Sequence, residues 1–198
     1  MATPDITFRI EEAKRTRAIY LGLVLKQLFT LPESISTLTH LVSLDLSNNQ
    51  LSSLPGTFSG LTNLRMLFLN SNLFVRFPNI ILALGNTLEG LYLSGNQLEV
   101  LPDDISSLGK LMGLRISWNR LTSLPESIGK LTRLGTLILD GNNLVMLPVS
   151  LINCTNLARL SVSNNPIQHP PPHIQHTSQQ LFYLRYLSKG HGMGDDDC

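Results

Sequence analysis

Apolar residues recur along most of the chain in one spacing, LxxLxLxxNxLxxLPxxIxxLxx, with polar residues between them. The five regular copies each start with a leucine: Leu41, Leu64, Leu88, Leu111 and Leu134. Their usual period is 23 residues, and the second of them has 24. A degenerate first copy spans residues 18–40, and a seventh starts at Leu157 and loses the pattern near Pro170. So many matched copies indicate a repeat architecture.

Each segment of the repeat predicts a local structure. The alternation Leu44-Asp45-Leu46 indicates a short strand with leucines on one face, so one strand per copy predicts a parallel sheet. The asparagine after each strand has an amide that both donates to and accepts from a turning backbone. The following Leu-Pro step places a residue with fixed φ and no N–H, which suits an irregular convex side. No copy buries its leucines alone, so the core must form by stacking.

These motifs together resemble the leucine-rich repeat family. The 23-residue period with Leu-Pro and Ile-x-x-Leu is similar to the intracellular subclass of Ras-suppressor and scribble-type proteins, over about residues 18–174. The resemblance implies an α/β fold: a leucine-rich repeat solenoid of about seven coils, with a parallel sheet on the concave face and helical caps at both ends. It also implies protein binding, although members of the family share an architecture while their partners differ.

The ends of the chain differ from the repeats, and we expect a single domain of 198 residues. It divides into four parts in chain order: a cap helix at 1–17, repeats at 18–174, a second cap helix at 175–189 and a flexible tail at 190–198. In the first helix Ile6, Ile10 and Ala13 fall on one face. In the second, Thr177 and Gln180 have the spacing of a capping box.

Composition and charge exclude several classes of protein. The chain has 40 leucines and is 42% hydrophobic and 15% charged, a balance that excludes a disordered chain. A net charge of +1 gives no electrostatic reason to expect nucleic acid as a partner, and no apolar run is long enough for a membrane span. The polar N-terminus lacks a secretory signal, so we expect a reduced, cytoplasmic protein, and a monomer. A mature secreted chain is the alternative.

Candidates for catalytic chemistry are few. No phosphate loop, nucleophile elbow or dinucleotide fingerprint is present, so we expect no enzyme, no metal and no cofactor. Cys154 stands where five other copies hold leucine, which predicts a buried structural thiol. The segment with His169, His173 and His176 has two interpretations: a metal or enzymatic site, or a simple connector after the last repeat. We favour the connector. The acidic tail that ends at Cys198 offers at most weak cation binding.

The concave face carries the positions that say most about function. The third, fifth and seventh positions of LxxLxLxxN point away from the core, and the eighth lies at the exit of the strand. The central copies hold large side chains there, whereas the flanking copies hold mostly Ser, Asn and Asp: Met66, Phe68, Tyr92, Arg115, Trp118 and Ile138. Trp, Tyr and Arg dominate binding hot spots, and we expect Gly90, Gly95 and Gly113 to leave open space beside them. The competing interpretation is a scatter of exposed apolar residues.

We therefore expect a non-catalytic interaction module or scaffold that binds a protein or peptide partner on its concave face. The aromatic residues would anchor the partner, Arg115 would contact a carboxylate or a carbonyl, and Asp45 and Asp140 would tune the charge at the rim. By resemblance, such modules serve intracellular signalling around small GTPases or phosphatases. The alternative is a substrate-recognition or regulatory subunit of an enzyme complex, a ligase or a phosphatase, which would copurify with a catalytic subunit.

Overall fold

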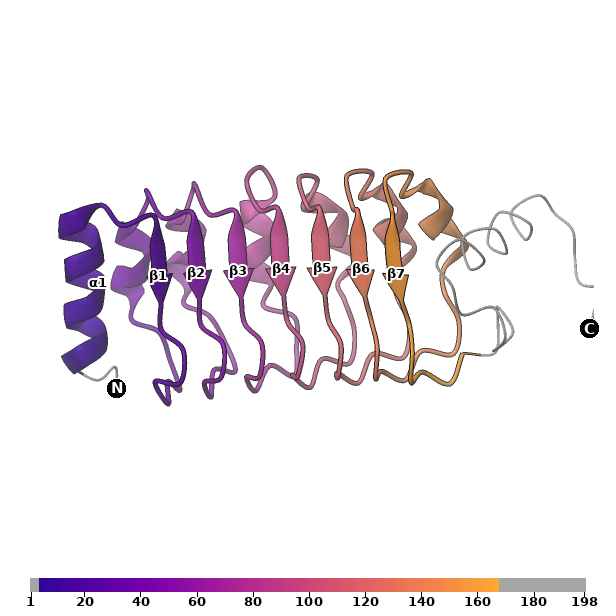
Figure 1. Cartoon of the computed structure of the whole chain (residues 1–198), viewed down its shortest axis with the longest axis horizontal. Helices are drawn as coiled ribbons and strands as arrows, with labels where there is room; N and C mark the ends of the chain where they lie inside the picture. The colour runs from indigo at the N-terminus through magenta and orange to yellow at the C-terminus, as the bar shows by residue number, and fades with distance from the viewer. Residues whose placement is uncertain (1–3, 168–198) are drawn as a thin grey trace, which may run out of the picture.

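Seven parallel strands form one open sheet in the computed structural model, which describes residues 4–167 (Figure 1). The strands have three residues each and lie side by side in chain order: β1 (Tyr20–Gly22), β2 (Ser43–Asp45), β3 (Met66–Phe68), β4 (Gly90–Tyr92), β5 (Gly113–Arg115), β6 (Thr136–Ile138) and β7 (Arg159–Ser161). The middle residue of every strand is a leucine in register with its equivalent in the next coil, as Leu91 is with Leu114. This is the predicted solenoid, with one strand per repeat.

A short 3-10 helix lies behind each of the first six strands (Figure 1): η1 (Glu33–Thr37), η2 (Gly56–Gly60), η3 (Asn79–Leu84), η4 (Asp103–Ser107), η5 (Glu126–Lys130) and η6 (Val149–Asn153). The expectation of an irregular convex side was therefore wrong. The prolines just before these helices have φ between −63° and −74°, and their carbonyls accept the first helical bond, as Pro125 does from the Ile128 N–H at 3.0 Å. Proline thus sets the backbone for the turn without needing a partner for an N–H.

The space between the sheet and the 3-10 helices is one continuous apolar core. The middle leucines of the strands are buried, and each 3-10 helix buries at least one apolar residue; Leu114 and Leu121 are completely buried. The core runs unbroken from Ile6 to Leu160, so each coil contributes one layer and depends on its neighbours for cover.

A ladder of buried asparagine amides joins neighbouring coils at the turn after each strand, as the sequence predicted. In Asn119, Nδ2 donates to the carbonyls of Leu93 in the preceding coil and Ile116 in its own, at 2.9 and 3.1 Å. Its Oδ1 accepts the Leu98 N–H at 2.9 Å. One amide thus satisfies three buried backbone groups that belong to two coils. Asn72, Asn96 and Asn142 make the same set of contacts.

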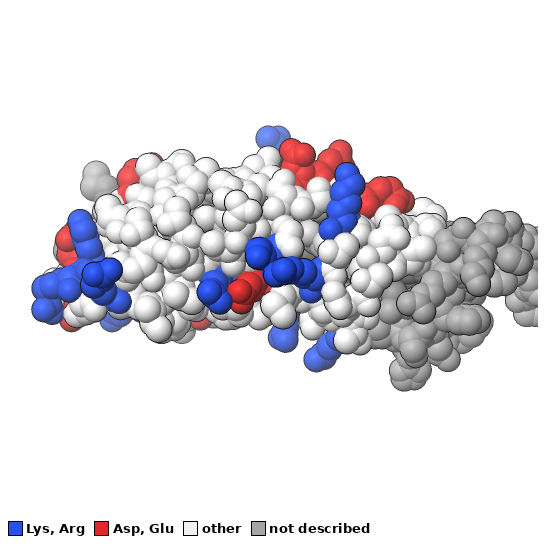
Figure 2. All heavy atoms as spheres, turned by 90° about the horizontal axis from the view of Figure 1, so that it is seen from above, with Lys and Arg blue, Asp and Glu red and all other residues white. Residues whose placement is uncertain are grey.

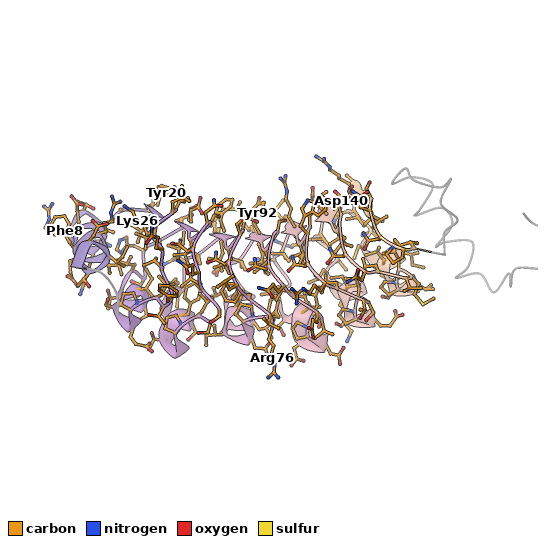
Figure 3. The ribbon with its side chains drawn as sticks, turned by 90° about the horizontal axis from the view of Figure 1, so that it is seen from below. Phe8, Tyr20, Lys26, Arg76, Tyr92 and Asp140 are labelled. Carbon is orange, nitrogen blue, oxygen red and sulfur yellow. The ribbon has the colours of Figure 1, made fainter. Side chains whose placement is uncertain are left out.

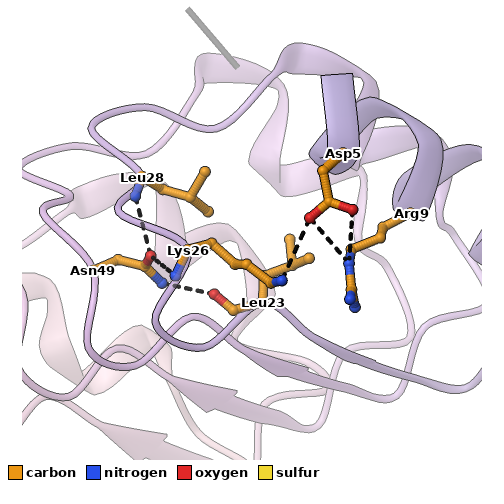
Figure 4. A network of polar contacts seen from close by, with 6 residues as sticks. All are labelled: Asp5, Arg9, Leu23, Lys26, Leu28 and Asn49. Atoms are coloured by element: carbon orange, nitrogen blue, oxygen red, sulfur yellow. Dashed lines mark hydrogen bonds and ion pairs between the residues drawn. The ribbon is translucent and has the colours of Figure 1, made fainter. Parts of the chain in front are cut away.

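Helix α1 (Pro4–Thr16) closes the N-terminal end of the core. Its Ile6, Ile10 and Ala13 are buried against the first coil, as predicted. Asp5 ties the helix to that coil, because its Oδ2 lies 3.4 Å from Nζ of Lys26 and 3.3 Å from Nε of Arg9 (Figure 4).

The first coil is less regular than the others, since Lys26 stands where they carry the ladder asparagine. Asn49 of the second coil compensates: its Oδ1 accepts the N–H groups of both Lys26 and Leu28, at 3.0 and 3.1 Å (Figure 4). Both neighbours of Lys26, Leu25 and Gln27, have positive φ.

Several expectations fall on residues that the structure does not describe. The second cap helix at 175–189, the tail at 190–198, Cys198 and the histidines at 169, 173 and 176 all lie outside residues 4–167. Within residues 4–167, no helix has the length and apolar character needed to cross a membrane.

Candidate functional site

The concave face is the exposed face of the sheet, opposite the six 3-10 helices. On each strand the middle leucine points into the core and its two neighbours form this face. The parallel register aligns these neighbours into rows that cross the sheet. The first row includes Met66, Gly90, Gly113, Thr136 and Arg159, and the second row includes Asp45, Phe68, Tyr92, Arg115 and Ile138.

Three side chains of the second row stack on one another across β3, β4 and β5. The rings of Phe68 and Tyr92 are 4.4 Å apart between centroids and 10° from parallel. The guanidinium carbon of Arg115 lies 5.4 Å from the centroid of the Tyr92 ring, on the next strand. Aromatic stacking and cation–π attraction both favour this arrangement and hold Tyr92 in place from two sides. In Figure 3, Tyr92 lies on the side of the molecule that carries the sheet.

The glycines beside this stack differ from one another, and the expectation of open space holds for one of the three. A Cβ on Gly90 would meet the Cε atom of Met66 at 2.7 Å, so Met66 fills that place. A Cβ on Gly95 would lie 3.2 Å from Oγ of Ser71. Nothing lies within 4 Å of the corresponding point on Gly113, so the space above its backbone is open, two residues before Arg115.

Trp118 stands at the exit of β5 and is 62% exposed. Its φ is 56°, in the left-handed region. The equivalent residues of the other six coils also have positive φ, and most of them are residues that tolerate it: Leu25, Asn48, Ser71, Gly95, Gly141 and Asn164. A bulky residue in this conformation costs about 1–2 kcal/mol. The repeat uses this conformation in every coil, so the bulky Trp118 carries a local strain that glycine and asparagine avoid.

Three of the candidate residues have a different environment from the expected one. Ile138 is buried, with only 9% exposed, so it offers little surface to a partner. Oδ1 of Asp140 accepts the Ser161 hydroxyl at 2.6 Å and the Ser163 N–H at 2.8 Å. Oδ1 of Asp45 accepts the Ser47 N–H at 2.9 Å. The two aspartates thus support the backbone at the ends of their strands as well as contributing charge.

The seventh position of the repeat was expected to point away from the core, but it contributes to the structure of the sheet. Ser47 and Ser117 are buried at this position. In the neighbouring coils, Asn70 accepts the Ser94 N–H and the Ser94 hydroxyl accepts the Ser117 N–H. The side chains of Asn70, Ser94 and Asp140 thus accept backbone N–H groups just beyond the next strand.

Two exposed apolar residues of the first coil were not singled out from the sequence. Tyr20, at the start of β1, is 56% exposed, and Leu25 is 73% exposed at the position equivalent to Trp118. Figure 3 shows Tyr20 on the same side of the molecule as Tyr92. The sequence could have indicated both residues, because each occupies a concave-face position of the repeat.

Cys154 is the predicted structural thiol. It is buried in the position that holds leucine in other coils, and its Sγ lies 3.3 Å from the Ile128 carbonyl oxygen. Burial raises the pKa of this thiol to about 11, because the thiolate is poorly solvated there. The thiol is therefore unreactive at neutral pH. Across residues 4–167, no three side chains of His, Cys, Asp or Glu come together as ligands for a metal ion.

The chain belongs to the leucine-rich repeat family, since the family model described as "Leucine rich repeat" matches residues 21–74 and 86–144. A comparison with curated protein sequences gives no match.

Several solved structures resemble the chain. The complex PEPR1–AtPEP1 is 35% identical over 69% of this chain and 20% of that one, with a TM-score of 0.61. A second structure is the leucine-rich repeat ectodomain of the plant membrane receptor kinase GASSHO1/SCHENGEN3 from Arabidopsis thaliana, in complex with Casparian strip integrity factor 2. The match is 27% identical and covers 69% of this chain and 20% of that chain, with a TM-score of 0.53. An internalin from Listeria monocytogenes shares the fold. The match is 22% identical and covers 73% of this chain and 48% of the internalin chain, with a TM-score of 0.57. The chain spans less than half the length of these proteins.

Proposed function

We propose that this protein is a non-catalytic interaction module whose concave face binds a protein or an extended peptide. The observation that carries the proposal is the stack of Phe68, Tyr92 and Arg115 across three strands, with the exposed Trp118 at the exit of the third. These residue types dominate binding hot spots. The leucine core does not use them, and the fold keeps Trp118 in a strained conformation.

The sheet makes this surface rigid before a partner arrives. Tyr92 is held between Phe68 and Arg115, and the backbone beneath it is fixed by the register of β3, β4 and β5. Little conformational entropy on the scaffold side is therefore lost on binding. The Arabidopsis receptor ectodomain, solved in a complex, supports such a use of the architecture.

We further propose that the module acts in the cytoplasm, in signalling, as the similarity of its 23-residue repeat to Ras-suppressor and scribble-type proteins implies. A fluorescent fusion of the chain in the cells that produce it tests the location. Diffuse or cortical cytoplasmic signal supports the proposal, and secretion into the medium contradicts it.

The binding proposal is tested by affinity capture from extracts of the same cells, followed by mass spectrometry. The wild-type chain is compared with the double variant Tyr92→Ala/Trp118→Ala. The matched control is Phe8→Ala/Phe29→Ala, which removes two aromatic residues that are 67% and 63% exposed outside the concave face. We expect a partner that the wild type and the control retain and the double variant loses. Equal capture by all three proteins would contradict the proposal.

A further inference from the structure

The charged side chains are distributed unequally between the two sides of the solenoid. Four exposed cationic residues lie in β5 and β7 or three residues before β5 and β6: Lys110, Arg115, Arg133 and Arg159. Acidic residues of the same coils, Asp103, Asp104 and Glu126, start the 3-10 helices on the opposite side. Figure 2 shows most of the acidic side chains of the central coils along one edge, with some basic ones among them, and mainly basic side chains toward the other edge.

The register of the sheet places two of these cations, Arg115 and Arg159, on the same face as Gly113. Arg115 follows Gly113 by two residues on β5, so both point to the concave face. Arg159 lies in the same row as Gly113, two strands away, which is about 10 Å at the spacing of parallel strands. Lys110 and Arg133 precede β5 and β6 by three residues each. Within residues 4–167, ion pairs are formed by Arg9, Lys26 and Arg65, and none by these four cations.

The nearby carboxylates have partners of their own. Glu89, directly before β4, pairs with Arg65 at 3.3 Å. Asp140 accepts two hydrogen bonds from β7 and the residues after it, at the end of the face away from Gly113. The charge of Asp140 disfavours a second carboxylate at this end of the face. An acidic group of a partner is therefore directed toward Gly113, Thr136 and Arg159.

We infer that the partner of the concave face is an acidic segment of polypeptide in extended conformation. It places a large apolar side chain over Gly113, next to Tyr92 and Arg115, and a carboxylate between Arg115 and Arg159. This inference rests on the proposed function, and it names the chemistry of the partner. Successive strands are about 4.8 Å apart, so a segment that crosses β4 to β7 needs about five extended residues. Complementary charge accelerates association and selects the partner.

The test is a selection of displayed random peptides of about 12 residues, long enough to cross all seven strands, on the immobilised full chain. We expect the selected peptides to be enriched in Asp or Glu close to Trp, Phe, Tyr or Leu. Arg115→Glu is expected to weaken them at least about tenfold. Raising the salt from about 50 to 500 mM is expected to weaken them roughly fivefold or more.

Two further variants distinguish the effects of charge and shape on binding from an effect on folding. Gly113→Thr occupies the open space above residue 113 with the side chain that the next coil carries as Thr136. The variant is expected to fold normally and to weaken the peptides at least about tenfold. Arg76→Glu makes the same charge change as Arg115→Glu on the side away from Tyr92 (Figure 3), and binding is expected to stay within about twofold of the wild type.

The outcomes distinguish this inference from the proposed function. Peptides that Tyr92→Ala no longer binds but that have no acidic bias, or that Arg76→Glu weakens as much as Arg115→Glu does, would overturn the acidic partner and leave the binding face intact. If the selection yields no peptide whose binding requires Tyr92, the concave face does not bind peptides, and both proposals fail.

Discussion

The indole ring of Trp118 lies against Gly141 of the next coil. Its Cε3 atom is 2.5 Å from the point where a Cβ of residue 141 would stand. The absence of a side chain at Gly141, which has φ of 67°, therefore sets the position of the exposed indole. This contact joins β5 to the coil of β6 at the edge of the proposed binding surface.

Gly141→Ala should displace this indole, because the new methyl group would overlap the ring and alanine is strained at positive φ. The chain has one tryptophan, so its fluorescence reports the change directly. We expect a shifted emission maximum and greater quenching by iodide. Gly109→Ala, where a Cβ would meet nothing within 4 Å, is the control and should leave the spectrum unchanged. Identical spectra for all three proteins would show that Trp118 does not rest on Gly141.

The strain at Trp118 predicts an order of stability for its variants. Asparagine tolerates positive φ and occurs at the equivalent positions Asn48 and Asn164, whereas a β-branched residue does not tolerate it. Trp118→Asn should unfold with a free energy equal to or above that of the wild type. Trp118→Val should lose about 1–2 kcal/mol. Urea unfolding measures both, and a Val variant as stable as the Asn variant would show that the backbone at Trp118 is relaxed.

The asparagine ladder should be costly to interrupt. Asn119→Ala leaves the Leu98 N–H and the carbonyls of Leu93 and Ile116 without their side-chain partner, so we expect a loss of about 1–3 kcal/mol in the free energy of unfolding. Asn143→Ala removes an exposed amide in the next turn and should change stability by less than about 0.5 kcal/mol. Equal losses in thermal unfolding would contradict the ladder argument.

Cys154 predicts a decline in stability at high pH. Its pKa rises from an ordinary value near 9.0 to about 11 in the folded protein. Above pH 9 the unfolded chain releases this proton and the folded chain retains it, so stability is unaffected below pH 9 and falls as pH rises toward 11. The decline is about 1.4 kcal/mol per pH unit at most.

The control is Cys154→Ala, which lacks the titrating thiol but keeps the other groups that titrate in this range. Chemical unfolding at pH 8, 9 and 10 should show a shallower decline for the variant. Parallel declines would mean that the thiol is as well solvated in the folded chain as in the unfolded one.

The fold could be predicted from the sequence because every coil repeats the same local pattern. The leucine positions identify the strands, and the ladder asparagine follows at a constant distance. The 3-10 helices could not be predicted, since five residues such as Glu126–Lys130 are too few to show a helical period.

The candidate site could be predicted only in outline, because its details depend on contacts between neighbouring coils. The sequence places Tyr92 and Arg115 on the exposed face of the sheet and Trp118 at the exit of its strand, and the structure has them there. The burial of Ile138, the hydrogen bonds of Asp140 and the cover that Met66 gives to Gly90 all involve residues about 21–24 positions apart. A periodic pattern identifies which residues share a face, and it does not say how their side chains pack across strands.

The central claim is that the leucine core makes the fold and the concave face makes the function, and one paired measurement tests it most directly. Thermal unfolding and a binding titration with the captured partner are run on four alanine variants: Leu91→Ala, Leu114→Ala, Tyr92→Ala and Trp118→Ala. The leucines are fully buried in the same two strands, so each variant should lose about 2–5 kcal/mol of stability. The two aromatic variants should stay within about 1 kcal/mol of the wild type, and Trp118→Ala should lose about 2 kcal/mol or more in binding. If Trp118→Ala unfolds as readily as Leu114→Ala, or folds normally and binds as tightly as the wild type, the account is contradicted.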